Sequence, residues 1–394
     1  MPREIWVLVG AAFLVAVGFG LVAPALPTFA RSFDVGIAAA SAVISAFSVF
    51  RLGFAPVSGR LVTVLGERRV FLSGLAVVAA STGACAVAQN YWQLLLFRAL
   101  GGIGSTMFSV SAMTLLFRLA PPRGRARASG LWSVGFLFGT LTGPLIGGGL
   151  VAVSLRAPFV VYAVALVVTA VISGALLGRS GPRGPATGDG QAREAAKGSE
   201  LRRVLRHPSY RAALLASFAN GWAVFGVRVA LVPLFVVEAL RQAPSWAGFA
   251  LTVFAAGNGV GLLAAGRWAD RRGRKPPLLV GLALISASTC WLGFTGSLPL
   301  FMVAALVGGV GSGLLSPSMN ATVADILGPK GRGGPVLAGF QMVSDLGAII
   351  GPVAAGAVAE ASSYGVAFAV TGAVPLLALA AWLRAPETLP ARAR

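Results

Sequence analysis

Ionisable side chains interrupt several stretches of this sequence that are otherwise apolar. They are Arg51, Arg98, Arg228 and Asp345. A charge at the depth of a bilayer costs several kcal/mol unless it faces protein or water, so Arg51 in particular needs a partner. A carboxylic acid in such surroundings can exchange a proton, because desolvation favours its neutral form and a nearby cation favours its ionised form. The pattern indicates proton or ion handling within a membrane.

The composition places the chain in a bilayer. Hydrophobic residues make up 56% and charged residues only 11%, whereas a soluble protein is about a quarter charged. A membrane helix needs roughly 20 apolar residues, and twelve such runs follow one another. They span residues 5–29, 37–57, 70–89, 92–117, 129–151, 157–178, 210–237, 245–265, 277–296, 299–324, 335–358 and 365–383. They leave no room for a soluble catalytic domain, so we expect a protein that is not an enzyme.

The net charge of +20 would suggest nucleic acid as the partner of a soluble protein, but its distribution argues against that partner. Of the 32 Lys and Arg residues, 26 lie in the termini and in the even-numbered connections between the runs. By the positive-inside rule, both termini are then cytoplasmic. We expect a multi-pass protein of the cell inner (plasma) membrane that contacts the lipid bilayer and no nucleic acid.

Two glycine pairs reveal an internal repeat. Gly59 and Gly66 recur as Gly266 and Gly273, 207 residues later. An offset of a little over half the chain indicates a tandem duplication. Each pair lies between two apolar runs and within a burst of Arg and Lys, as a tight cytoplasmic hairpin between membrane helices requires.

The repeat also aligns polar positions within the apolar runs. At the same offset, Arg51 corresponds to Asn258 and Phe47 to Phe254, so each half carries a polar group at this depth. Other polar or aromatic residues of the runs are candidates for lining a substrate cavity. The candidate cavity residues are Arg98, Arg228, Asn258, Asn220 and Trp222.

The second glycine loop resembles a family signature. The segment Gly266-Arg267-Trp268-Ala269-Asp270-Arg271-Arg272-Gly273-Arg274-Lys275 is similar to the loop motif of the major facilitator superfamily, which occurs between helices 2 and 3 and again between helices 8 and 9. The resemblance implies that these loops gate the cytoplasmic side. The first copy departs from the motif, since Thr63 replaces the acid and Glu67 replaces a base. We therefore expect the second copy, with Asp270, Arg271 and Arg274, to carry more of the gating.

Two further helices resemble motifs of this superfamily. The fifth run carries glycines and a proline at Gly130, Gly139, Gly143, Pro144, Gly147, Gly148 and Gly149. This pattern is similar to the helix-5 signature of exporters that work as antiporters, and glycines at a spacing of four let a neighbouring helix approach closely. The fourth run carries Arg98-x-x-Gly-Gly-x-Gly, which resembles a motif whose arginine is associated with proton transfer or substrate anchoring. A structural hydrogen bond to a backbone carbonyl is the alternative for Arg98.

These features predict an all-α membrane protein of twelve transmembrane helices in two pseudo-symmetric six-helix halves, the major facilitator fold. We expect an N-terminal half over residues 1–178 and a C-terminal half over residues 209–394. Between them, residues 179–208 change to Gly, Pro, Ala and mixed charges and predict a cytoplasmic linker. Its end, residues 199–207, predicts a short amphipathic helix, with a solvated charge run as the alternative.

We expect secondary active transport, because the chain has no phosphate-binding loop for ATP. The favoured prediction is proton-coupled efflux, by antiport, of small amphipathic molecules, with Asp345 and Arg51 forming the coupling pair. An importer or uniporter of a small polar or anionic nutrient is the alternative, and a receptor or scaffold without transport is a third class. We expect a monomer without cofactor or metal, since the single histidine, His207, has no partners for a metal site.

Overall fold

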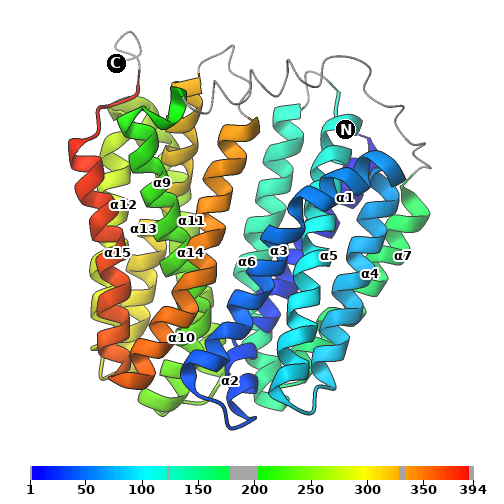
Figure 1. Ribbon diagram of the computed structural model, residues 1–394, viewed down its shortest axis with the longest axis horizontal. Helices are drawn as coiled ribbons and strands as arrows, with labels where there is room; N and C mark the ends of the chain where they lie inside the picture. The colour runs from blue at the N-terminus through cyan, green and yellow to red at the C-terminus, as the bar shows by residue number, and fades with distance from the viewer. Residues whose placement is uncertain (1, 122–124, 178–202, 328–333, 390–394) are drawn as a thin grey trace. The chain divides into compact units, whose positions relative to one another are not determined.

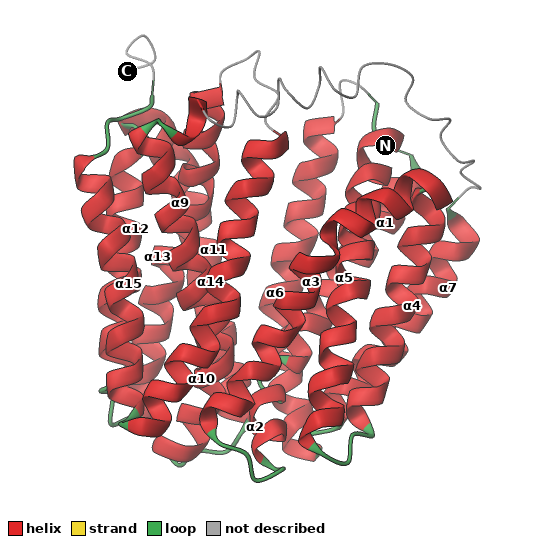
Figure 2. Ribbon diagram, viewed as in Figure 1, coloured by secondary structure: helices red, strands yellow, loops and turns green. Residues whose placement is uncertain are grey.

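The protein is described by a computed structural model that covers residues 2–121, 125–177, 203–327 and 334–389. Within these ranges the secondary structure is helical, joined by short turns (Figure 2). The helices, labelled in Figure 1 where space allows, are α1 (Arg3–Val22), α2 (Leu26–Arg31), α3 (Ile37–Leu65), α4 (Glu67–Ala86), α5 (Tyr91–Leu119), α6 (Arg125–Val153), α7 (Ala157–Leu176), α9 (Pro208–Asn220), η2 (Gly221–Val227), α10 (Arg228–Leu234), η3 (Phe235–Ala239), α11 (Ser245–Arg272), α12 (Lys275–Leu292), α13 (Leu298–Leu327), α14 (Gly334–Ala361) and α15 (Tyr364–Arg384).

Twelve of the described helical segments are long and apolar enough to cross a membrane. This result confirms the twelve runs that the sequence predicts. Several boundaries differ; at two of them, α3 and α11 continue to Leu65 and Arg272, where the apolar runs end at 57 and 265. The extension of α11 contains Arg267, Arg271 and Arg272, which are good helix formers, so helix formation continues past the hydrophobic segment there.

Backbone conformation ends these two long helices. Gly66 has φ 84° and Gly273 has φ 101°, a left-handed region that residues with a Cβ rarely adopt. Gly59 and Gly266, in contrast, lie inside α3 and α11, and a Cβ at either position would meet nothing within 4 Å. The predicted ten-residue hairpins therefore shrink to turns at the second glycine of each pair.

The first and seventh spans are interrupted helices. The first breaks between Val22 and Leu26, because Pro24 has no backbone N–H to continue the ladder. The seventh, Pro208–Ala239, contains two π-helical segments, η2 and η3. π-helices are rare and often lie at functional sites.

The chain forms two compact units. One comprises Met1–Ala186 with Pro233–Thr252, and the other comprises Thr187–Val232 with Val253–Arg394. In the first, α5 lies between α3 and α4 and contacts both, and α1 packs along α6 (Figure 1). In the second, α12 packs against α13 and α15, and α14 packs along η2. The predicted division at residues 178 and 209 stays a prediction.

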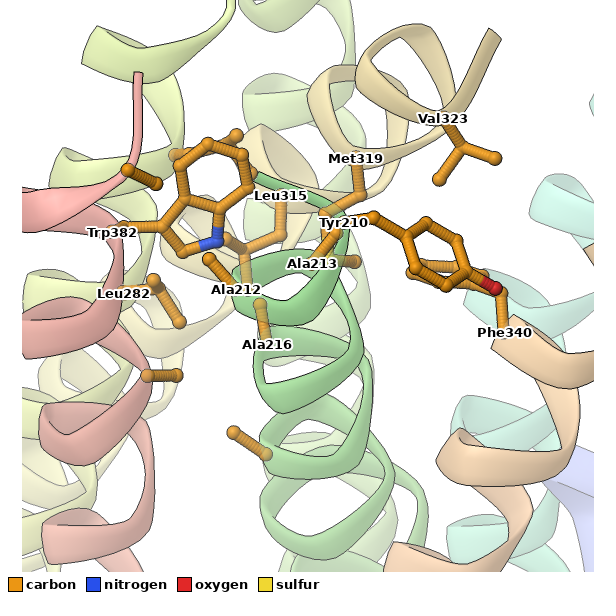
Figure 3. Packing of buried hydrophobic residues seen from close by; sticks show 14 of the residues in the cluster. Tyr210, Ala212, Ala213, Ala216, Leu282, Leu315, Met319, Val323, Phe340 and Trp382 are labelled. Atoms are coloured by element: carbon orange, nitrogen blue, oxygen red, sulfur yellow. The ribbon is translucent and has the colours of Figure 1, made fainter. Parts of the chain in front are cut away.

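The second unit has an aromatic core near the start of α9. Trp382 and Tyr210 are each 1% exposed, and Figure 3 shows Trp382 beside Leu282 and Tyr210 beside Phe340. The Tyr210 hydroxyl donates to the carbonyl of Val336 at 2.9 Å. Val204 is 1% exposed and joins this cluster, whereas Leu205 is exposed. The rest of the predicted amphipathic helix, residues 199–202, lies outside the described residues.

Candidate transport site

Arg98 is buried within the first unit. It lies on α5, is 7% exposed, and its guanidinium carbon is 4.3 Å from the ring centroid of Phe47 on α3 and 6.0 Å from that of Phe19 on α1. Its Nε has no hydrogen-bond partner among the described residues. The cation therefore lies between three helices of its own bundle, held by aromatic faces.

Arg228 is buried in a similar setting within the second unit. It begins α10, is 5% exposed, and its guanidinium carbon is 4.0 Å from the ring centroid of Phe254. Phe254 belongs to a small buried cluster with Val224 and Ala305. Phe47 and Phe254 are the residues that the 207-residue repeat aligns, so each unit places one guanidinium over the same repeat position.

The other predicted cavity residues of the second unit lie on α9, η2 and α11. Asn258 donates from Nδ2 to the Ser312 hydroxyl of α13 at 3.1 Å. Asn220 is 7% exposed, and its Oδ1 has no hydrogen-bond partner in the described structure. Trp222 packs against Phe218, with ring centroids 5.9 Å apart, and its Nε1 likewise has no described partner. Orphaned buried polar atoms of this kind are candidates for contact with water or a ligand.

The two predicted coupling residues fall in different units. Asp345 is half-buried on α14, and its Oδ1 accepts a hydrogen bond from Gln341 Nε2 at 3.3 Å. Arg51 is half-buried on α3, where its carbonyl accepts from the Thr106 hydroxyl at 2.7 Å. Their pairing stays a prediction.

Asp345 lies where α14 meets the seventh span most closely. The neighbouring Ser344 contacts Gly221 so tightly that no Cβ could be placed there, and Gly347 lies equally close to Phe218 and Trp222. Gly221 is the first residue of the π-helical segment η2. The acid therefore adjoins the point at which the seventh span changes its helical register.

An ion pair fixes the first glycine turn. Glu67, directly after Gly66, is 2% exposed, and its Oε2 lies 3.2 Å from Arg118 Nη1 at the end of α5. The acid that breaks the loop motif thus has a basic partner within its own unit. Thr63 stands where the motif has an acid, and its hydroxyl donates to the Arg60 carbonyl at 2.7 Å.

The second glycine turn has an ion pair at the two aligned positions, with the acid and the base exchanged. Arg274 Nε lies 3.2 Å from Asp325 Oδ2 at the end of α13, and Arg274 Nη1 lies 2.5 Å from Asp270 Oδ1. Burial alone lowers the pKa of Arg274, but hydrogen bonds to Asp270 and Asp325 raise it above its ordinary value. Arg271, the remaining gate candidate, is exposed at this turn.

Glu387, beyond the last helix, binds the start of α12. Its carboxylate accepts hydrogen bonds from the backbone N–H groups of Arg274 and Lys275 at 2.9 and 3.0 Å. It also accepts from Thr388 and Leu389 at 2.9 and 3.0 Å. Desolvation alone raises the pKa of Glu387, but these N–H donors lower it below its ordinary value. This carboxylate satisfies free donors at a helix N-terminus, where negative charge is favourable.

The residues that complete both turns, Arg118, Asp325 and Glu387, are absent from the sequence-based prediction. A signal for two of them was present, because Arg118 and Asp325 are 207 residues apart, as are Glu67 and Arg274. Comparing the charges of aligned positions, rather than the motif alone, would have found both pairs. Glu387 had no such signal, since its role depends on how the chain returns to α12.

The helix-5 glycines form one packing face of α6. A Cβ at Gly139 would lie 2.6 Å from the Phe13 carbonyl oxygen of α1, and Gly143 and Gly147 lie equally close to the backbone at Val17 and Leu21. Gly148 faces Gly248 of α11 instead, and Pro144 contacts Gly20. Gly130 and Gly149 have nothing within 4 Å of an added Cβ. The spacing of four thus brings two backbones of the first unit together.

The opposite end of the first unit is held by another pair of aligned residues. Arg31 Nε donates to Glu238 Oε1 at 2.8 Å, and the two residues are 207 apart. Both line a cavity of about 680 Å³. Asp34 and Arg241, which the repeat also aligns, both have positive φ, at 56° and 52°.

Comparison with known proteins identifies the family. A sequence model of the Major Facilitator Superfamily matches residues 8–240 and 213–394. The chain belongs to the major facilitator superfamily. The predicted resemblance and the predicted fold class, a multi-pass membrane protein, are therefore confirmed.

Curated relatives of this major facilitator protein include drug-resistance proteins. It is 30% identical over 159 residues to the quinolone resistance protein NorA of Staphylococcus aureus (strain N315), covering 40% of this chain and 41% of the relative. It is 34% identical over 105 residues to multidrug resistance protein 3 of Bacillus subtilis (strain 168), covering 27% of this chain and 20% of the relative. These matches span less than half the length of the relatives.

Solved structures support the major facilitator fold over nearly the whole chain. A bacterial homologue of the human lysosomal transporter Spinster, in an inward-facing and unoccupied conformation, has a TM-score of 0.77 at 17% identity, covering 96% of this chain and 95% of that chain. The human organic anion transporter MFSD10 (TETRAN) has a TM-score of 0.69 at 20% identity, covering 97% and 100%. At these identities the likeness concerns the fold.

Proposed function

We propose that this protein is a secondary active exporter that exchanges protons for small amphipathic molecules by alternating access. It acts as a monomer in the inner (plasma) membrane, with both termini cytoplasmic. The observation that carries the proposal is Asp345, a carboxylate within a transmembrane span whose neighbour Ser344 packs on Gly221 at the start of η2. The similarity to the resistance proteins favours efflux over uptake.

The proposed coupling uses the two charge states of Asp345. While ionised, the carboxylate is stabilised by a positive charge, for which Arg51 is the proposed partner in one state of the cycle. Protonation removes that attraction and makes an apolar environment acceptable. Because Asp345 lies on the turn of α14 that touches Gly221, a shift of its side chain can reach the seventh span.

Proteoliposomes with an imposed pH gradient test this function. Wild-type protein should concentrate an amphipathic dye against its gradient, on the side from which protons leave. Asp345→Asn should abolish uphill transport but retain downhill exchange. Glu360→Gln, on the exposed end of the same helix, is the matched control and should transport normally.

The result also separates the alternatives. Continued accumulation of dye by the Asp345→Asn variant would refute the coupling role of Asp345. Dye that only equilibrates across wild-type vesicles, whatever the pH gradient, would favour a uniporter. Accumulation together with protons, rather than in exchange for them, would favour an importer.

A further inference from the structure

Arg228 is a buried cation without a compensating charge in the described part of the protein. Its side chain is 5% exposed within the span Pro208–Ala239. Its guanidinium makes no hydrogen bond or ion pair with a described residue, and Nε is fully enclosed. An arginine does not lose its proton in proteins, so the charge persists.

The stacking on Phe254 does not offset the cost of burying this charge. A desolvated cation–π contact is favourable, but it contributes less than burying an ion costs, even after the protein relaxes. The 4.0 Å contact with Phe254 therefore leaves a deficit. An anion bound at the guanidinium would remove that deficit, because charge-assisted hydrogen bonds are among the strongest in proteins.

A second hydrogen-bond donor, the Ser288 hydroxyl, lies close to the guanidinium. A Cβ added to Gly308 would lie 2.9 Å from Arg228 Nη2 and 2.7 Å from the Ser288 hydroxyl oxygen, so both groups lie against the same glycine. The Ser288 hydroxyl donates to the Ile285 carbonyl at 3.1 Å and can rotate toward a new acceptor. Phe254 closes the apolar side.

The first unit contains the same arrangement, built from another helix. Arg98 stacks on Phe47, and Ser81 lies 2.9 Å from a Cβ added to Gly101. Phe47, Ser81 and Gly101 each precede Phe254, Ser288 and Gly308 by 207 residues. The arginines are not aligned, since one comes from α5 and the other from α10. Each unit therefore places a guanidinium over the same ring position, although different helices supply it. This recurrence argues that a cation at this position has a role in each unit.

We propose that Arg228, Ser288 and Gly308 form a binding site for a small monovalent anion. The anion is either a free halide ion or the carboxylate of a small compound, which share the chemistry that the guanidinium recognises. The inference is independent of the direction and coupling of transport, because it concerns binding alone.

Thermal unfolding of the purified full-length protein tests the site. Chloride, in one series, and formate, in another, replace gluconate at constant ionic strength. An anion at ten times its dissociation constant should raise the melting temperature of the wild-type protein by about 2 °C. A response to chloride alone identifies a halide site, and a response to formate identifies a carboxylate site.

Variants separate specific binding from general effects of salt on a basic protein. Arg228→Gln should lose the shift, and Arg211→Gln, at an exposed arginine of α9, should retain it. If Arg228→Gln does not fold, Gly308→Ala serves instead, because its methyl group narrows the site and should reduce the shift by more than half. Gly259→Ala is its matched control, since an added Cβ there meets nothing within 4 Å. The proposal is overturned if neither anion shifts the wild type, or if the shift persists in both site variants.

Discussion

The exchanged ion pairs at the two glycine turns allow a charge-reversal test. Arg118→Gln removes one partner of a carboxylate that is 2% exposed, whereas Glu67→Gln removes one partner of an arginine that is 28% exposed and can turn toward water. Breaking a buried pair costs about 3–5 kcal/mol, and breaking an exposed one costs about 1 kcal/mol or less. We therefore expect Arg118→Gln to destabilise the protein by about 2–3 kcal/mol and Glu67→Gln by about 1 kcal/mol.

Reversing both charges should recover most of this loss. Glu67→Arg combined with Arg118→Asp recreates the pair that Arg274 and Asp325 form at 3.2 Å in the second unit. About 1 kcal/mol should stay lost, because the native orientation places negative charge at the start of α4 and positive charge at the end of α5, which helix dipoles favour. Adding Thr63→Asp, the counterpart of Asp270, should recover part of the remainder.

The assay is reversible unfolding of each variant in mixed micelles, arranged as a double-mutant cycle. The pairing would be refuted if the loss of unfolding free energy in the Glu67→Arg/Arg118→Asp double variant equalled the sum of the losses in the two single variants. Equal costs for Arg118→Gln and Glu67→Gln would refute the argument from exposure.

Two further predictions concern packing and pH. Gly143→Val should reduce transport more than tenfold at normal membrane expression, because its side chain would clash with the α1 backbone. Gly149→Val should transport normally, because an added Cβ there meets nothing within 4 Å. A vesicle flux assay compares the two variants. Glu387→Gln should lower stability by about 1 kcal/mol at pH 7, as loss of a helix cap does. Because backbone donors lower the pKa of Glu387 below its ordinary value, this difference should persist at neutral pH and be lost as the pH falls through the lowered pKa. Unfolding measured in a series from pH 7 downward follows that loss.

The number of spans and their class follow from the sequence because bilayer thickness constrains them directly. Each apolar run must be long enough to cross, so counting runs gives the helices that the structure shows. The sequence-based prediction missed the helix ends at Leu65 and Arg272 because it relied on hydropathy. Hydropathy marks where a segment leaves the bilayer, whereas backbone geometry at Gly66 and Gly273 marks where the helix stops.

The polar contacts of the candidate site could be predicted only in part. Periodicity and depth single out Arg98, Arg228 and Asp345, because each is a charge in an apolar run. The ring that faces Arg228 could not be predicted in this way, since Phe254 lies on another helix and only the packing of the second unit brings them together. The π-helical register of η2 also depends on packing, because it begins where Gly221 meets α14.

Each glycine turn has an ion pair and a negative charge at the start of the helix that follows, but the two turns place the charges of the pair in opposite order. In the first, Glu67 begins α4 and provides both the negative charge that a helix N-terminus favours and the partner of Arg118. In the second, Arg274 precedes α12 and its charge opposes that helix dipole. Glu387 supplies the missing negative charge there through its hydrogen bonds to the N–H groups of Arg274 and Lys275. Exchanging the charges of the pair therefore requires an additional acid, and the chain provides it from beyond its last transmembrane helix.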